Sequence, residues 1–140
     1  MRPPDQVVRD FVRQWLDKAG KDLEAAEVLL AGEMKDYESA AFHAQQAAEK
    51  FLKALLVRHQ VVFPKSHEIR LLRGLVARVD RALADEVSAA DALTPYGVEF
   101  RYPGDMEPVS RERAEGAVRL AEQVRDVALS RLKSYLAVLE

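Results

Sequence analysis

Cysteine is absent from the 140 residues of this chain, which excludes disulfide bonds, thiolate nucleophiles and cysteine-ligated zinc. No uninterrupted apolar run reaches the roughly 18 residues that a membrane-spanning helix requires. The first residues, Met-Arg-Pro-Pro, contain no apolar signal segment. We therefore expect a cytoplasmic protein without membrane association, folded as a single domain over residues 1–140.

Familiar catalytic and metal-binding motifs are also missing. The chain contains no HExxH, no Walker loop and no GxGxxG. Histidine occurs only at His43, His59 and His67, and none of these has a glutamate three residues before it, so the Glu-x-x-His motif of di-iron bundles is excluded. The three histidines share no helical spacing, and we expect neither a metal nor a cofactor.

The sequence has no stretch in which apolar and polar residues alternate with a period of two. Apolar residues instead recur at steps of three and four, which is typical of amphipathic helices. After Pro3 and Pro4, the pattern predicts four long helices, over about 5–31, 36–59, 66–79 and 110–139, and a short helix over about 81–93. The fold class predicted is an all-α, antiparallel up-and-down helical bundle.

Polar residues that favour helix starts support these boundaries. Asp36, Ser66 and Ser110 each precede an apolar-periodic segment and are predicted to be N-caps. Residues 94–109 are rich in proline and glycine, which predicts a loop with no regular element.

The net charge of −2 conceals an uneven distribution. Residues 50–81 contain eight basic side chains and only two acidic ones, Glu68 and Asp80. This +6 segment is suited to phosphate, RNA or an acidic partner. It is equally suited to a solvated helix face that balances the acidic helices beside it.

One line of polar residues follows the second helix, opposite its apolar stripe. Gln46, Lys50 and Lys53 lie on this line, with Phe42 beside it. The lysines are candidates for phosphate binding. The alternative, which we favour for the lysines, is a solvated face in which Glu49 and Lys53 form a weak pair. Phe42 and Gln46 are predicted to contribute to a protein interface.

His67 is predicted to lie in the first turn of the third helix, where its imidazole can bind phosphate or simply pin the preceding connector to the bundle.

Arg101 and Tyr102 form the best candidate site, in the predicted loop and close to Tyr96. A guanidinium offers a planar fork for phosphate, and a tyrosine offers a stacking face and a hydroxyl group. The alternative is a loop packed down by its two tyrosines, with the arginine paired to Glu99 or Asp105.

The sequence resembles the HEPN family. The resemblance is carried by Gln45–Leu56 (QQAAEKFLKALL), by Trp15, Asp22 and Leu23 before it, and by Ser66–Ile69, Tyr96 and Arg101–Pro103 after it. It covers most of the chain. It implies a helical homodimer that is often encoded beside a minimal nucleotidyltransferase, in pairs that act as toxin and antitoxin.

The resemblance also implies a site. In the nuclease branch of the family, an arginine followed by four to six residues and a histidine cleaves RNA without a metal. Here the last histidine is His67, so none follows Arg101. The chain instead resembles the Arg-Tyr-Pro branch, for which nucleotide binding has been proposed. The leading hypothesis is a regulatory module that binds nucleotide or RNA phosphate through Arg101, Tyr102, Tyr96, His67 and the lysines. The alternative is a metal-independent endoribonuclease toxin in which Arg101 binds phosphate and His67 moves the proton.

Overall fold

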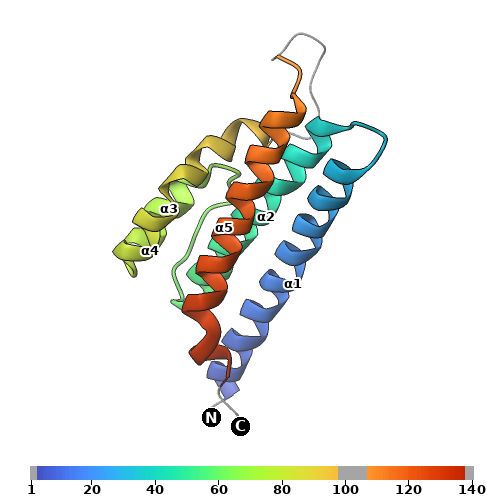
Figure 1. The fold of residues 1–140 in the computed structure, drawn as a ribbon. Helices are drawn as coiled ribbons and strands as arrows, with labels where there is room; N and C mark the ends of the chain where they lie inside the picture. Colours follow the sequence, from blue (N-terminus) through green and yellow to red (C-terminus); the bar gives the residue numbers. More distant parts are fainter. Residues whose placement is uncertain (1–2, 98–106, 138–140) are drawn as a thin grey trace.

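The computed structural model describes residues 3–97 and 107–137, and every regular element within them is helical (Figure 1). In chain order the elements are α1 (Pro3–Ala31), α2 (Tyr37–Arg58), α3 (Ile69–Ala77), α4 (Arg81–Glu86), the 3₁₀-helix η1 (Ser88–Tyr96) and α5 (Arg111–Leu136). The predicted all-α class is confirmed.

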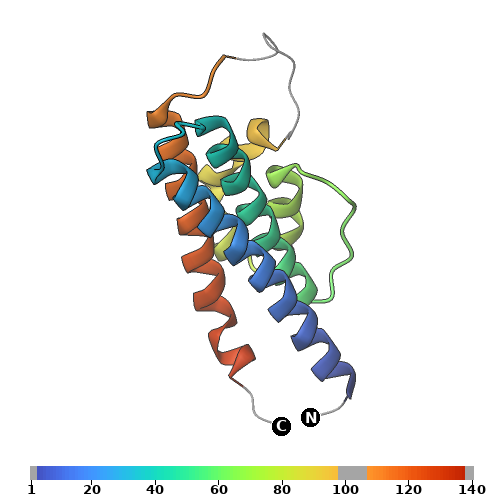
Figure 2. The ribbon, with the colours of Figure 1, turned by 90° about the vertical axis from the view of Figure 1, so that its right-hand side faces the viewer.

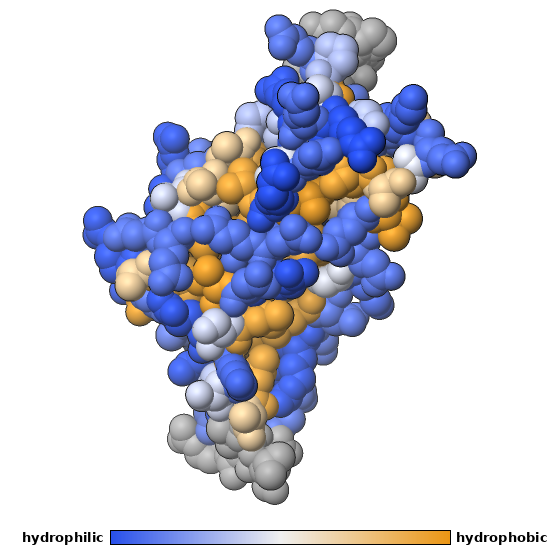
Figure 3. Space-filling view, in the orientation of Figure 1, coloured by the Kyte–Doolittle hydropathy of each residue, from blue (hydrophilic) through white to orange (hydrophobic). Residues whose placement is uncertain are grey.

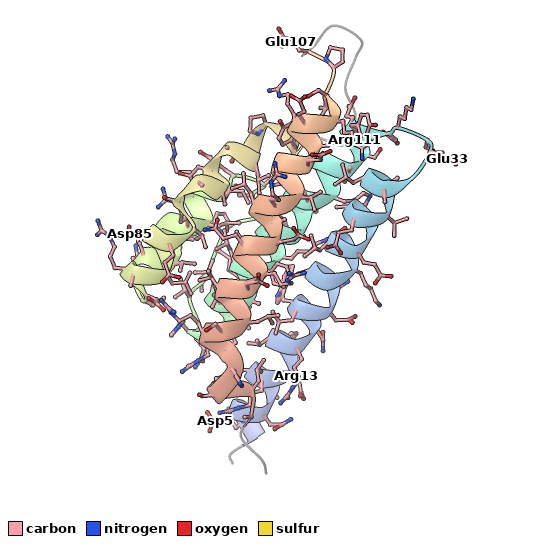
Figure 4. All side chains as sticks on the ribbon, viewed as in Figure 1. Asp5, Arg13, Glu33, Asp85, Glu107 and Arg111 are labelled. Carbon is pink, nitrogen blue, oxygen red and sulfur yellow. The ribbon has the colours of Figure 1, made fainter. Side chains whose placement is uncertain are left out.

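Three long helices, α1, α2 and α5, lie side by side, and the short elements α3, α4 and η1 cover one side of them (Figures 1 and 2). α1 runs opposite to α2, whereas α2 and α5 run in the same direction. The start of α1 and the end of α5 meet at one end of the bundle. There the Arg9 Nε donates to the Tyr135 carbonyl at 3.0 Å, and Arg13, labelled in Figure 4, donates to the Leu136 carbonyl at 3.1 Å. Cations at a helix C-terminus are favourably placed against its dipole.

α2 is the central helix of the bundle. Its inward residues include many alanines, whose small side chains let neighbouring helices approach closely. Phe51, Leu52 and Leu56 fill the space between these helices and the short elements. The burial extends around the helix, so the face that carries Lys53 is not the solvated face that we favoured from the sequence: Lys53 is only 8% exposed.

Two of the three predicted N-caps are confirmed. The Asp36 side chain accepts a hydrogen bond from the Ser39 backbone N–H at 3.1 Å, and Ser110 caps α5 in the same way through Arg113 N–H, also at 3.1 Å. The prediction for Ser66 was wrong. α3 begins only at Ile69, and the Ser66 hydroxyl accepts from the Glu68 N–H inside the connector at 3.0 Å.

The largest difference from the sequence prediction lies in residues 66–96. Three helices are long, with 29, 22 and 26 residues, while α3 has only 9. The single helix predicted over 81–93 divides at Val87 into α4 and η1. Contrary to the predicted loop from residue 94, η1 continues to Tyr96 and includes Pro95.

None of the helices within residues 3–97 and 107–137 combines the length and the apolar character that a membrane span requires.

Candidate functional site

A row of polar side chains lies inside the protein along α2. Gln45, Glu49 and Lys53 follow one another at four-residue steps, so their side chains lie on one face of the helix. The exposed fractions of the three whole residues, backbone included, are 0%, 2% and 8%. Burial of a charged group costs several kcal/mol unless the group is paired and hydrogen-bonded. The partners of this row therefore determine both its stability and its chemistry.

The cationic end of the row is Lys53. Its Nζ donates to the Glu49 Oε2 at 2.8 Å. The same Nζ lies 5.5 Å from the ring centroid of Trp15 and 5.7 Å from that of Phe63, and these two rings meet edge to face at 6.2 Å. The ammonium group is thus held between one carboxylate and two aromatic rings, which compensate for its loss of hydration.

The other Glu49 oxygen holds His67, which lies in the connector between α2 and α3. The His67 Nδ1 is 2.8 Å from the Glu49 Oε1, although the imidazole is 66% exposed. The connector is also held through its backbone, because the Gln45 Nε2 donates to the His67 carbonyl at 2.8 Å and, at 3.4 Å, to the Glu49 Oε1. Through these bonds His67 pins the connector to the bundle.

The pairing also sets the tautomer and the orientation of the imidazole. An ionised Glu49 only accepts hydrogen bonds, so Nδ1 carries a proton and the ring is fixed in orientation. In the described part of the chain, Glu49 is the only partner of this ring. The Nε2 atom of an exposed and oriented histidine is thus left for a phosphate oxygen or a substrate proton.

Lys50 belongs to a separate cluster. Its ammonium bonds to the carboxylate of Asp22 on α1, and the other oxygen of that carboxylate is 3.0 Å from the His43 Nδ1. The structure therefore brings Lys50 and Lys53 to two different carboxylates and does not present them together to a phosphate.

The two predicted interface residues are both partly buried. The Phe42 ring lies edge to face against the His43 ring, with centroids 5.3 Å apart. The Gln46 Nε2 donates to the Gln45 Oε1 at 2.6 Å, which extends the buried row toward the surface.

The end of η1 closes against this row. The Thr94 hydroxyl accepts from the Ile69 backbone N–H at 3.2 Å. A Cβ atom on Gly97 would lie 3.1 Å from the Gln45 side chain, so a residue with a side chain would displace the amide. Tyr96, the last residue of η1, is partly buried and lines a groove between η1 and α5. Arg101 and Tyr102 lie outside the described residues.

Most of the +6 segment is balanced by partners within the protein. Arg73 binds Asp91 through two hydrogen bonds of 2.8 and 2.7 Å, and this guanidinium lowers the pKa of the Asp91 carboxyl. Further basic side chains of the segment that contact a carboxylate or an aromatic ring are Lys50, Lys53, Arg58, Arg70 and Arg81. Among the described residues, no ion-pair partner contacts Lys65 or Arg78. Pairing with neighbouring carboxylates therefore accounts for most of the positive charge of this segment.

The burial of Gln45 is not predicted from the sequence, and Glu49 is predicted there only as half of a weak surface pair with Lys53. The available signal was their spacing, since Gln45, Glu49 and Lys53 form an i, i+4, i+8 line beside the line that we chose. Over residues 3–97 and 107–137, no cluster of acidic and histidine side chains is suited to hold a metal ion.

Comparison with known proteins gives a consistent assignment. The chain is 26% identical over 137 residues to "Putative toxin MJ1304" of Methanocaldococcus jannaschii, an alignment that covers 88% of this chain and 89% of the archaeal protein. The crystal structure of TT1696 from Thermus thermophilus superimposes with a TM-score of 0.71 at 29% identity, covering 86% of this chain and 98% of the other. The family described as HEPN domain matches residues 12–132. This protein therefore belongs to the HEPN family.

Proposed function

We propose that this protein is a HEPN module that binds nucleotide or RNA phosphate and acts in a toxin–antitoxin-like pair with a minimal nucleotidyltransferase. The observation that carries the proposal is the exposed His67 imidazole held by the buried Glu49 carboxylate at 2.8 Å. The carboxylate on Nδ1 fixes the orientation of the ring and therefore of Nε2. In this proposal an imidazolium form of the ring donates a charge-assisted hydrogen bond from Nε2 to a phosphate oxygen.

The remaining candidate residues have different roles in this proposal. Lys50 and Lys53 are bonded to carboxylates, so they support the site through the fold rather than by direct contact with phosphate. Arg101 and Tyr102 follow Gly97 closely in sequence, and Gly97 packs against Gln45 of the site. We propose that this segment supplies a guanidinium for phosphate and a ring for stacking.

The proposed pairing rests on family membership and on the toxin name of the archaeal relative. We further propose that the protein is a homodimer and that Phe42 and Gln46 contribute to a protein interface. Expression of this protein alone is expected to slow bacterial growth, and co-expression of a nucleotidyltransferase encoded beside it should restore growth and co-purify with it. A monomer that neither affects growth nor retains such a partner would contradict this part of the proposal.

Binding to RNA is tested by fluorescence anisotropy with a labelled oligoribonucleotide, comparing the wild type with His67→Ala. Loss of one charged hydrogen bond is worth about 1.5–3 kcal/mol, which corresponds to a roughly 10- to 150-fold weaker affinity. His59→Ala is the matched control, because burial and the neighbouring Arg58 lower the pKa of His59 and keep it neutral. Equal affinities for all three proteins would contradict the assignment of the site.

The same observation favours a second candidate, a metal-independent endoribonuclease. Here the His67 Nε2 would accept the proton of a ribose 2′-hydroxyl as that oxygen attacks the adjacent phosphorus, while the 5′-oxygen of the next nucleotide departs with a proton taken from water. Arg101 would stabilise the charge on the phosphorane. The expected result is RNA cleavage in the presence of EDTA, with a 2′,3′-cyclic phosphate product, that is lost in both His67→Ala and Arg101→Ala. Cleavage unchanged by both substitutions would exclude this mechanism.

A further inference from the structure

A groove lies between η1 and α5, and of the described residues of the candidate site only Tyr96 lines it. Its volume is about 520 Å³, and its apolar floor is formed by Leu93, Ala117 and Leu120. In Figure 3, hydrophobic side chains are visible beside the upper part of α5, on the side of η1. A volume of this size lies within the range of roughly 300–1,000 Å³ that is typical of sites for small ligands.

Two cationic side chains line this groove. Neither the Arg113 nor the Arg119 guanidinium has an ion pair or a hydrogen bond to any described residue. They differ in this from other arginines of α5, since Arg111 pairs with Glu115 and Arg125 with Asp126, both at 2.8 Å. A free guanidinium beside an apolar floor is suited to a ligand that carries a phosphate.

The groove also offers space for a flat ring. Tyr96 lines it from η1, and Gly116 lines it from α5. A Cβ atom on Gly116 would meet no heavy atom within 4 Å, so the space above this glycine is open. Without a side chain at residue 116, the backbone of α5 is open to a flat ring that would stack between it and Tyr96.

We propose that this groove binds a phosphorylated nucleoside, with the base between Tyr96 and Gly116 and the phosphate on Arg113 and Arg119. Both the free mononucleotide and a nucleotide within RNA have this chemistry. The inference rests on the proposed function and deepens it, because it supplies a contact for the base that His67 cannot provide. The groove adjoins that site, since Gly97, next to Tyr96, packs against Gln45.

The test measures the affinity of AMP and of a labelled oligoribonucleotide for the full chain carrying Gly116→Leu. Gly20→Leu is the matched control, because Gly20 is also helical and also has no heavy atom within 4 Å of a built Cβ. Leucine favours helices more than glycine does, so both variants should fold and melt at or above the temperature of the wild type. We expect AMP to bind Gly116→Leu at least tenfold more weakly than Gly20→Leu, and the double variant Arg113→Ala/Arg119→Ala to show a similar loss.

The outcomes separate this inference from the function on which it rests. Equal AMP affinity in Gly116→Leu and Gly20→Leu would contradict nucleotide binding in the groove, whatever the effect of His67→Ala on RNA binding. Displacement of AMP by a poly-glutamate peptide at equal charge concentration would also overturn it, because such binding would need charge and no ring. RNA binding that depends on His67 while the groove variants have no effect would support the proposed function and contradict nucleotide binding in the groove. Stronger effects on RNA than on AMP would identify RNA as the source of the bound nucleotide.

Discussion

Removal of the buried ammonium group of Lys53 is the substitution from which we expect the largest effect on stability. The Lys53 and Glu49 side chains are 10% and 3% exposed, and their charged atoms are 2.8 Å apart. Lys53→Met keeps the unbranched stem and the packing against the aromatic rings but leaves the Glu49 carboxylate without its ammonium partner. Removal of one partner of a buried pair typically destabilises a protein by about 3–5 kcal/mol.

For Lys53→Met we expect the lower end of this range, about 3 kcal/mol, because Glu49 keeps its bonds to His67 and Gln45. With a urea m-value of about 2 kcal/mol/M, the midpoint of unfolding should fall by about 1.5 M. The double variant Glu49→Leu/Lys53→Met should recover most of the loss, since it leaves no unpaired charge inside the protein.

Urea unfolding followed by circular dichroism at a fixed chain concentration measures both effects. Lys21→Met is the control, because this lysine is 76% exposed and its pair with Asp17 lies at the surface. It should change stability by less than about 0.5 kcal/mol. A Lys53→Met variant as stable as Lys21→Met, or a double variant less stable than Lys53→Met, would refute the reasoning.

Three further predictions concern α5 and the pH dependence of stability. Ser110→Ala removes the N-cap of α5 and should cost about 1 kcal/mol in urea unfolding. Asp91→Asn should lower the melting temperature at pH 7 and have a progressively smaller effect below pH 3.8, because Arg73 lowers the pKa of Asp91 and the resulting stabilisation is lost as the pH falls through that lowered pKa. Glu27→Gln should raise the melting temperature at pH 7 and lose this advantage below pH 4.5, since a hydrogen bond with Glu122 raises the pKa of Glu27 above its ordinary value of 4.5.

The two pH predictions have opposite signs, and each can fail separately. A carboxyl group with a lowered pKa stabilises the fold above its unfolded pKa, whereas one with a raised pKa stabilises it below that value. A loss from Asp91→Asn that does not diminish as the pH falls below 3.8 would show that the pairing with Arg73 is not its cause. A destabilised Glu27→Gln at pH 7 would show that Glu122 does not repel Glu27 in the folded state.

The sequence predicted three of the four expected long helices well, because each of these three depends on local signals. The apolar period, Asp36 and Ser110 determine where α2 and α5 begin. The prediction that Lys53 is solvated failed for a non-local reason. A helical projection assigns Lys53 to the face opposite the apolar stripe, but it does not reveal that α1 and the connector cover that face with Trp15 and Phe63. Burial of α2 depends on contacts between segments far apart in the chain.

The candidate site was predicted only in part for the same reason. His67 was identified from a predicted position in the first turn of the third helix, whereas it lies in the connector before α3. Its partner Glu49 lies 18 residues earlier and meets it only because the connector folds back along α2. The partner of Lys50 is Asp22 on α1, which no local pattern indicates. The predicted roles of Arg101 and Tyr102 lie outside the described residues and stay predictions.

The central claim is that Glu49 holds His67 in position for phosphate, and nitrogen NMR of histidine-labelled protein tests it most directly. The chain has only His43, His59 and His67, so their ring resonances can be assigned by single substitutions. We predict that RNA shifts the Nε2 resonance of His67 and leaves that of His59 in place, and that Glu49→Gln weakens this response. A His67 resonance that does not change when RNA binds would contradict the account.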